Sequence, residues 1–389
     1  MTLALPAAVA RRSYGLLFTI VLLDLVGFGI VLPLLPTHAA GFTSSGAAIG
    51  ILVASFSLMQ FLVAPWWGRL SDRIGRRPVL LAGIAASAVS YVMFALAGTY
   101  LVLLASRVLA GGVGATVNVS QAYLADITPE ERRTRAMGVI GVAFGMGFIL
   151  GPAIAALSSR AGAAIPGFIA GGICLLSFVI TWTSLPETRI SPTLPARPGS
   201  VSWRGFAAPF AVMFLSVAAF AVITVVFPLY AAAVLGFGRR ETSMVFVLMG
   251  VCSAVVQGWL IGRLTPAVGE RTLMLAGSVL IAAGLAAIPL SPGLAGPWSL
   301  AVLLAAVSLV AAGSGFAWPG VAGYVSRAAA ARDQGQLLGA LHSVASLARV
   351  AGPVLAGLLS EQAGAAAAFL VAAGLAGAAG LAAVGARAG

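Results

Sequence analysis

Apolar stretches long enough to cross a lipid bilayer recur along nearly the whole chain of 389 residues. A hydrocarbon core of about 30 Å needs about 20 consecutive apolar residues in a helix. Only 8% of the residues are charged and the mean hydropathy is +1.06, so a water-soluble fold could not hide this much apolar surface. We therefore expect about twelve membrane spans, near residues 14–35, 47–67, 78–97, 100–122, 136–158, 163–185, 206–233, 242–262, 272–291, 297–321, 337–360 and 364–385.

The basic residues set the expected orientation of these spans. The formal net charge is +12 and the chain has no lysine, so its 22 basic residues are all arginines. They are scattered through short loops and form no single basic face, which argues against a nucleic-acid partner. With the N-terminus in the cytoplasm, most arginines fall in cytoplasmic loops, and only Arg160, Arg239 and Arg240 fall outside. The positive-inside rule then predicts a multi-pass membrane protein with both termini cytoplasmic.

A polar gap and an internal repeat divide the chain into two halves. The gap predicts an N-terminal bundle at 1–187, a cytoplasmic central loop at 188–205 and a C-terminal bundle at 206–389. The pattern Gly68-Arg69-Leu70, Gly75, Arg77 reappears in the second half as Gly262-Arg263-Leu264, Gly269, Arg271. Gly138 and Gly151-Pro152 likewise reappear as Gly339 and Gly352-Pro353. Two bundles related by an internal repeat are a transporter architecture that can rock about a site near the middle of the membrane.

Several sequence motifs resemble one known family. Residues 68–78, between the second and third spans, read GRLSDRIGRRP. Other motifs are LDLVGFGIVLPLLP at 23–36, LMQ at 58–60, APW at 64–66 and PET at 186–188. Together they resemble the drug:proton antiporters of the tetracycline-efflux type, within the major facilitator superfamily, most densely over about residues 15–190. The resemblance implies an all-α integral membrane fold with two pseudo-symmetric six-helix bundles, in a bacterial inner membrane.

The loop after the second span is a candidate cytoplasmic gate. Gly68 and Gly75 suit a tight reversal, where a side chain would obstruct helix approach or a positive φ is needed. Asp72 and Arg76 can form a charge-assisted hydrogen bond at the membrane surface. In the family, the matching residues close the cytoplasmic side, and the arginine also meets an acid after the fourth span, for which Asp126 is the candidate. The alternative is that these charges only set topology, although an aspartate does little for topology.

Asp24 is the acidic residue placed well inside a span, and an intramembrane carboxylate is costly unless it is paired, hydrated or protonated. It is the candidate proton-coupling site. Arg107 resembles the arginine of the fourth span that the family associates with proton transfer. At about 1.5 Å per residue, the two lie at levels about 5 Å apart in the membrane, within reach of an arginine side chain. The alternative is a structural salt bridge.

The fifth span carries small residues at the spacing of the family's antiporter motif: Gly138, Gly147, Gly151 and Pro152. Small residues let two helix backbones approach closely, and a proline can bend the helix. Ala155 and Ala156 stand where the motif usually ends in glycine. Ordinary close packing and a direct role in antiport both remain open as interpretations.

Polar residues in or at the ends of spans are candidates for the substrate cavity: Gln60, Asn118, Gln257, Trp318, His342 and Arg349. Hydrogen bonding between helices is the alternative for each of them. Arg349 lies about 18 Å into its span, without an intramembrane acid in its half of the chain, and could meet an anionic or carbonyl-rich substrate. His342, on the same helix, is more often a packed polar residue than a proton relay.

These observations predict a secondary active transporter that exports a drug-like small molecule in exchange for protons. The alternative is a proton-coupled transporter of a metabolite such as a sugar or an organic anion. Tetracycline itself is a doubtful substrate, because the eighth and ninth spans lack the acidic and histidine residues associated with tetracycline efflux. No catalytic group, metal site or cofactor motif assembles, so we expect neither an enzyme nor a metal or cofactor. A receptor or scaffold that does not transport is the other functional class. The presence of Asp24, Arg107 and Asp72 argues against it. We expect a monomer whose partners are the substrate, the proton and the lipid bilayer.

Overall fold

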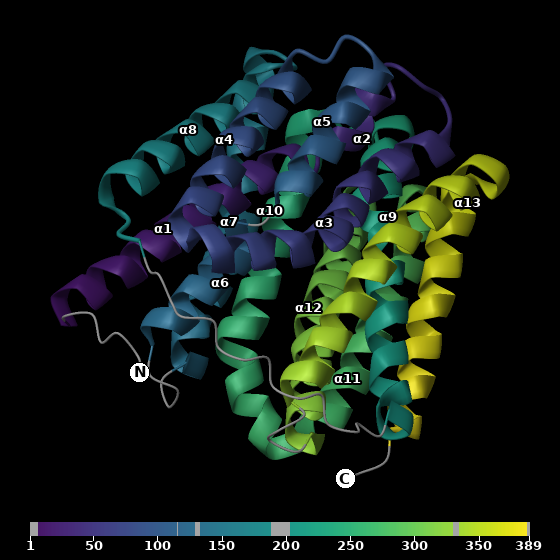
Figure 1. Cartoon of the computed structure of the whole chain (residues 1–389). Coiled ribbons are helices and arrows are strands. Elements are labelled where there is room, and N and C mark those ends of the chain that lie inside the picture. The colour runs from purple at the N-terminus through teal and green to yellow at the C-terminus, as the bar shows by residue number, and fades with distance from the viewer. Residues whose placement is uncertain (1–6, 115, 129–132, 188–202, 330–333, 387–389) are drawn as a thin grey trace. The chain divides into compact units, whose positions relative to one another are not determined.

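The computed structural model describes residues 7–114, 116–128, 133–187, 203–329 and 334–386, and the regular elements in this part of the chain are helices (Figure 1). The chain divides into two compact units. The first comprises 1–42 and 55–195, and the second comprises 43–54 and 196–389. The start of the second span, residues 43–54, therefore groups with the second unit. The prediction had placed the whole second span in the N-terminal bundle.

Ten helical stretches in the described residues are long and apolar enough to cross a membrane. Two of them, Arg239–Gly293 with 55 residues and Gln336–Gly385 with 50, are long enough for two crossings each. Each contains a glycine with non-helical backbone, Gly269 with φ 75° and Gly364 with φ 84°. Because side chains rarely adopt a positive φ, these glycines are where the chain reverses between consecutive spans. The expected number of spans is thereby confirmed.

The first unit is built from α1 (Ala7–Val31), α2 (Leu35–Ala39), most of α3 (Gly46–Ile74), α4 (Arg76–Ala95), α5 (Tyr100–Val113), α6 (Thr116–Ile127), α7 (Arg133–Ser158), the short η2 (Ser159–Ala161) and α8 (Ile165–Ser184). Within this unit, α1 packs against α7 and α8, and α4 packs against α8, α5 and α6. The fourth span, expected near 100–122, corresponds to the apolar stretch Tyr100–Ile127, which comprises the two helices α5, ending at Val113, and α6, beginning at Thr116.

The second unit contains the first turns of α3 together with η3 (Trp203–Phe206), α9 (Ala207–Val234), α10 (Arg239–Val255), the π-helical η4 (Val256–Leu260), α11 (Ile261–Ala287), η5 (Ile288–Gly293), α12 (Pro297–Ala328) and α13 (Gln334–Gly385). Here α9 packs along α13, and α11 packs against α12 and α13. The core of this unit is apolar, with Met274, Val321 and Ala348 fully buried.

The internal repeat is visible in the backbone of both units. Gly75, between α3 and α4, and Gly269, its counterpart in α11, both have positive φ. At the second repeated position, a Cβ added to Gly151 of α7 would lie 2.6 Å from the backbone of Gly29 in α1. A Cβ added to Gly352 of α13 would lie 2.8 Å from Ala221 in α9. Glycine therefore permits the same close helix approach in each half.

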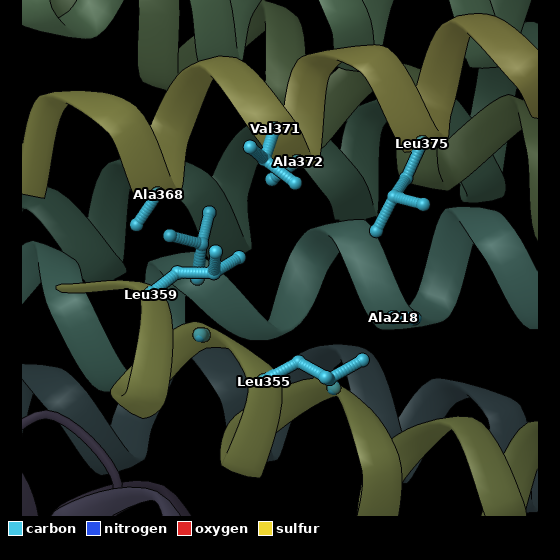
Figure 2. Close-up of a pocket in the computed structure, with 10 residues that line it drawn as sticks. Ala218, Leu355, Leu359, Ala368, Val371, Ala372 and Leu375 are labelled. Atoms are coloured by element: carbon cyan, nitrogen blue, oxygen red, sulfur yellow. The ribbon is translucent and has the colours of Figure 1, made fainter. Parts of the chain in front are cut away.

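A small pocket lies inside the second unit between α9 and α13 (Figure 2). Its volume is about 20 Å³, and it is lined by Gly352 and by alanine, valine and leucine side chains, among them Ala218, Leu355 and Leu375. A cavity of this size holds about one water molecule and would offer it no hydrogen-bond partner from a side chain. This pocket is therefore a packing defect between two helices and has no room for a substrate.

Candidate functional site

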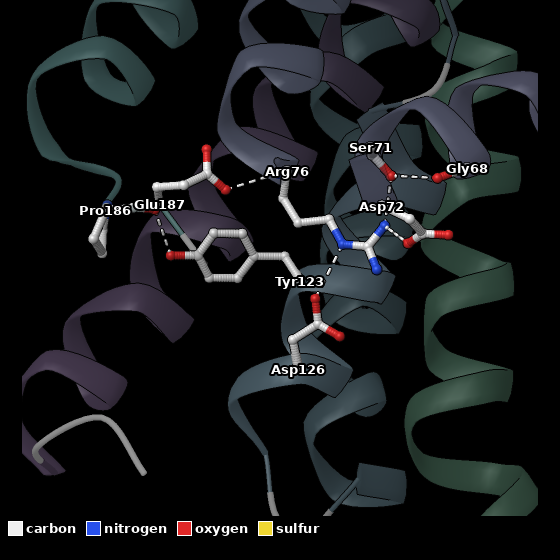
Figure 3. Close-up of polar contacts among 8 residues, drawn as sticks. All are labelled: Gly68, Ser71, Asp72, Arg76, Tyr123, Asp126, Pro186 and Glu187. Carbon is white, nitrogen blue, oxygen red and sulfur yellow. Dashed lines mark hydrogen bonds and ion pairs between the residues drawn. The ribbon is translucent and has the colours of Figure 1, made fainter. Parts of the chain in front are cut away.

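The predicted gate residues Asp72, Arg76 and Asp126 meet at one end of the first unit (Figure 3). The Arg76 guanidinium donates from Nε to Asp126 Oδ2 at 3.0 Å and lies 2.6 Å from Asp72 Oδ1 through Nη1. The side chains of Arg76 and Asp126 are 12% and 15% exposed, whereas that of Asp72 is 59% exposed. The contact with Asp126 is thus the better shielded of the two and the stronger electrostatically.

Glu187 is a further member of this cluster that the sequence did not single out for the gate. Its carboxylate accepts a hydrogen bond from the Arg76 backbone N–H at 2.9 Å, at the start of α4 (Figure 3). A Cβ on Gly75 would lie 2.6 Å from this carboxylate, and Gly75 has φ 104°, so both space and conformation require glycine there. The motif at 186–188 was noted as part of the family resemblance. The sequence alone does not indicate which residue an acid in a loop will contact.

Gly68 does not take part in the reversal that was expected of it. Helix α3 continues through Gly68 to Ile74, and a Cβ at Gly68 would meet nothing within 4 Å. Its carbonyl accepts a hydrogen bond from the Ser71 hydroxyl at 2.8 Å, and the same hydroxyl accepts one from Arg76. Gly68 therefore contributes only a backbone acceptor to the gate cluster.

Asp24 lies in α1, half-buried, beside the start of α6. A polar neighbour of Asp24 is Thr116, the first residue of α6, whose hydroxyl is buried. The N-terminus of a helix carries a partial positive charge that favours a nearby anion. Asp24 is therefore placed where a carboxylate can be held in the membrane with or without its proton.

Arg107 is not paired with Asp24 in this structure, and within the described residues no carboxylate lies within ion-pair distance of it. It is 2% exposed, and its guanidinium carbon lies 5.7 Å from the ring centroid of Tyr91 and 5.4 Å from that of Phe94. Its Nε donates to the Ser106 hydroxyl at 3.3 Å, while Nη2 is buried without a hydrogen-bond partner. Two aromatic rings of α4 thus hold the arginine by cation–π contacts.

Tyr91 is the residue that connects the two charged groups. A Cβ on Gly27, one turn after Asp24 on α1, would lie 3.1 Å from the Tyr91 ring and 3.4 Å from its hydroxyl. Tyr91 is 4% exposed and lies in the electrostatic range of both Asp24 and Arg107. Sequence reasoning missed it, because an aromatic residue in an apolar span carries no charge or motif that distinguishes it.

In the fifth span, Gly147 and Gly151 of α7 face α1 directly. A Cβ on Gly147 would lie 2.6 Å from Leu25 Cβ, and one on Gly29 would lie 2.9 Å from the Gly147 carbonyl oxygen. Pro152 lies inside α7, and a Cβ on Gly29 would lie 3.3 Å from its Cδ. Close packing is therefore present on the helix that carries Asp24. The surroundings of Gly138 lie outside the described part of the chain.

The cavity candidates of the first unit differ in environment. Gln60 donates from Nε2 to the Gly114 carbonyl oxygen at 3.2 Å, where α5 ends. It thereby satisfies a carbonyl freed at this helix end, as does Trp67, whose indole N–H donates to Gly112 at 2.6 Å. Asn118 is exposed on α6. Gln60 therefore forms a hydrogen bond between helices, which was the alternative to cavity lining. Asn118 is exposed and stays a candidate for the cavity.

In the second unit, Gln257 is exposed in the π-helical segment η4 and donates to Ser253 Oγ at 2.9 Å. Trp318 of α12 packs against Phe220 with ring centroids 5.3 Å apart, and its indole N–H is buried without a partner. Arg349 and His342 are both exposed on α13, and Arg349 Nη2 donates to Ser346 Oγ at 3.1 Å.

The chain matches a known protein family along most of its length. A profile of the Major Facilitator Superfamily matches residues 17–312 and 210–387. The chain is 31% identical over 362 residues to the class E tetracycline resistance protein of Escherichia coli, covering 89% of this chain and 87% of that protein. It is 25% identical to the quinolone resistance protein NorA of Staphylococcus aureus, covering 90% of each.

Solved structures include similar folds. The crystal structure of the human organic anion transporter MFSD10 (TETRAN) superposes with a TM-score of 0.72 at 25% identity, covering 97% of this chain and all of that one. The twelve-helix transporter fold expected from the sequence is confirmed by these matches together with the spans described above.

Proposed function

The chain belongs to the major facilitator superfamily, and on that premise we propose that it exports a drug-like small molecule across the membrane in exchange for protons. It is a multi-pass membrane transporter and not an enzyme. Relatives named for resistance to tetracycline and to quinolones support drug export as the transported class. Export in this fold requires the two bundles to open a common site alternately to either face of the membrane.

The observation that carries the proposal is the position of Asp24. It is an ionisable carboxylate in a membrane span that forms no ion pair within the described residues. An unpaired carboxylate in hydrocarbon is costly in its charged form, so changes in hydration can drive it to bind or release a proton. In the proposed cycle, Asp24 takes up a proton from the outer face as substrate leaves, and it releases that proton to the cytoplasm before substrate binds again.

Arg107 is proposed to change the proton affinity of Asp24 during this cycle. In the present structure it is held by Tyr91 and Phe94, so Asp24 is left to be neutralised by a proton. In the opposite conformation, a swing of the long arginine side chain toward Asp24 would stabilise the carboxylate and expel the proton. Proton affinity would thus change with conformation, as coupling requires.

The Arg76 cluster is proposed as the cytoplasmic gate, because it joins the ends of α3, α4 and α6 through Asp72 and Asp126. The α1–α7 contact at Gly147 and Gly151 is proposed to transmit movement of α7 to the helix that bears Asp24. The distribution of arginines supports a bacterial inner-membrane orientation with both termini cytoplasmic. The proposed working unit is a monomer with a small molecule and protons as partners and without nucleic acid.

One observation favours a second candidate, the transport of an organic anion. Arg349 is a cation within a membrane span that the structure pairs with no carboxylate in the described residues. The structure of MFSD10, which is named an organic anion transporter, is similar over nearly the whole chain. A metabolite anion therefore remains the alternative to a drug.

Transport in sealed proteoliposomes tests the proposal. A growth-inhibition panel in cells with and without the protein first supplies a substrate, and counterflow establishes that it is carried. Imposing a pH gradient should then drive uphill transport by the wild-type protein but not by Asp24→Asn, which should still catalyse counterflow. Glu241→Gln, an exposed acid in the first turn of α10, is the matched control and should behave as wild type. Undiminished uphill transport by Asp24→Asn would remove Asp24 from the mechanism.

A further inference from the structure

Helix α13 presents three polar side chains on one face at membrane depth. His342 and Arg349 are exposed, and Ser346 between them is half-buried and accepts a hydrogen bond from Arg349. At 3.6 residues per turn, residues three and four apart lie on one face of a helix. Arg349 is about 18 Å from the cytoplasmic start of this span, near the middle of a hydrocarbon core of about 30 Å.

The continuation of this face along α13 packs against protein. Continuing from Arg349 in steps of four, the same face carries Pro353 and Gly357, whose backbones touch those of Gly50 and Gly46 at the start of α3, within the same unit. On another side of α13, Leu347 is an exposed apolar residue, 54%, as expected of a lipid-facing surface. Leu341, Ala345 and Ala348 are buried against the rest of the unit.

Among the described residues of its unit, no carboxylate pairs with Arg349. The acids of the described second unit are Glu241, Glu270 and Glu361. Glu270 pairs with Arg327, Glu361 binds Ser45 and the Ala47 N–H, and neither pairs with Arg349. A guanidinium at this depth is costly unless it meets water or an anion, so this face must line a hydrated space.

We infer that this face of α13 binds an anionic group of the transported molecule, with Arg349 as the charged donor and His342 as a neighbouring polar contact. The Ser346 hydroxyl donates to the His342 carbonyl oxygen at 2.9 Å and accepts from Arg349, so it positions the arginine. The planar guanidinium has several donors in a fixed fork that suits a carboxylate, sulfonate or phosphonate. The Nη2 group of Arg349 donates a hydrogen bond to Ser346 Oγ, and this bond restricts the orientation of the guanidinium. The substrate class is therefore an amphiphilic organic anion or a zwitterion, and this inference rests on the proposed transport function.

Equilibrium binding in detergent tests this inference without transport. The probes are matched pairs that differ only in charge: benzoate and benzamide, 2-naphthoate and 2-naphthamide, and 1-pyrenebutyrate and 1-pyrenebutyramide. The wild-type protein should bind at least one carboxylate about tenfold or more tightly than its amide. Arg349→Gln should abolish that preference, Arg349→Lys should retain part of it, and Arg263→Gln, an exposed arginine beside Trp259, should leave it unchanged. No preference in the wild type, or a preserved preference in Arg349→Gln, would overturn the inference.

Labelling provides a second readout, in case Arg349 variants fold poorly. In a background with Cys174 and Cys252 replaced by serine, Ser346→Cys should react with a membrane-impermeant methanethiosulfonate, and the preferred carboxylate should slow that reaction. Leu347→Cys, on the lipid-facing side, should react at least tenfold more slowly. Equal reactivity of the two positions would also overturn the inference. Asp24→Asn should keep carboxylate binding while losing gradient-driven transport, so failure of coupling and failure of this site give different results.

Discussion

The guanidinium of Arg107 lies over the ring of Tyr91, 5.7 Å from its centroid, on the side chain that also packs against α1 one turn beyond Asp24. A single aromatic residue on α4 thus contacts both the helix of the proposed proton site and the cation expected to pair with it. The position of Arg107 is consequently determined by ring faces and not by a carboxylate.

Replacing Tyr91 should therefore affect coupling in a graded way. Tyr91→Phe keeps the ring face and should retain gradient-driven transport within about threefold. Tyr91→Leu removes a buried cation–π contact that contributes about 1–2 kcal/mol and should lower transport about tenfold. Transport rates in proteoliposomes against the external pH measure this, with counterflow as the control for folding. Equal losses in both variants would instead assign the effect to the hydroxyl.

The two acids at the gate should differ in their contribution to stability. Asp126 is 15% exposed and accepts a charge-assisted hydrogen bond, so Asp126→Asn should destabilise the protein by about 1.5–3 kcal/mol. Asp72 is 59% exposed, so Asp72→Asn should cost no more than about 1 kcal/mol. Unfolding in mixed micelles at two salt concentrations checks the order, and a larger loss for Asp72→Asn would contradict it.

Sequence reasoning reached the fold because the bilayer imposes it. Span length and arginine distribution are physical requirements of membrane insertion, and the turn at Gly75 and its repeat at Gly269 depend on a backbone conformation that favours glycine. The Asp72–Arg76 contact was expected from their positions at the membrane surface, whereas Asp126 was expected as a partner of Arg76 only because the family resemblance implied it.

The intramembrane contacts were harder to predict. Counting residues places Asp24 and Arg107 at similar depths, but it does not fix the direction in which each side chain leaves its helix. That direction depends on how α4 and α5 pack, and it brought Arg107 to Tyr91 and Phe94. The end of α5 at Val113 was also not predicted, since Gly114 lies in an otherwise apolar stretch and its carbonyl accepts a hydrogen bond from Gln60 of another helix. Long-range partners of this kind have no local sequence pattern.

Glycine substitutions in α7 should have opposite signs at two nearby positions. Gly151→Ala places a Cβ 2.6 Å from the backbone of Gly29, so overpacking should cost about 1–3 kcal/mol. Gly141→Ala meets nothing within 4 Å and should stabilise the helix by about 0.5–1 kcal/mol. The free energy of unfolding and the rate of uphill transport, measured for both variants, test whether α1 and α7 are in close contact at Gly151. Equal effects at the two positions would argue against it.

A pH-dependent contact should hold the first turn of α3 to the turn between the last two spans. Glu361 accepts hydrogen bonds from the Ala47 N–H and the Ser45 hydroxyl, both at 2.9 Å, and these bonds, the Ala47 one foremost, lower the pKa of the Glu361 carboxyl. A carboxyl with a lowered pKa stabilises the native contact above its ordinary pKa, which is about 4.3. That stabilisation is lost as the pH falls through the lowered value. Hydrogen exchange at the Ala47 amide, corrected for its intrinsic pH dependence, should be faster in Glu361→Gln than in wild type at pH 7. The difference should shrink below pH of about 4, and a difference that stays constant across this range would show that the charge of Glu361 is not what holds the contact.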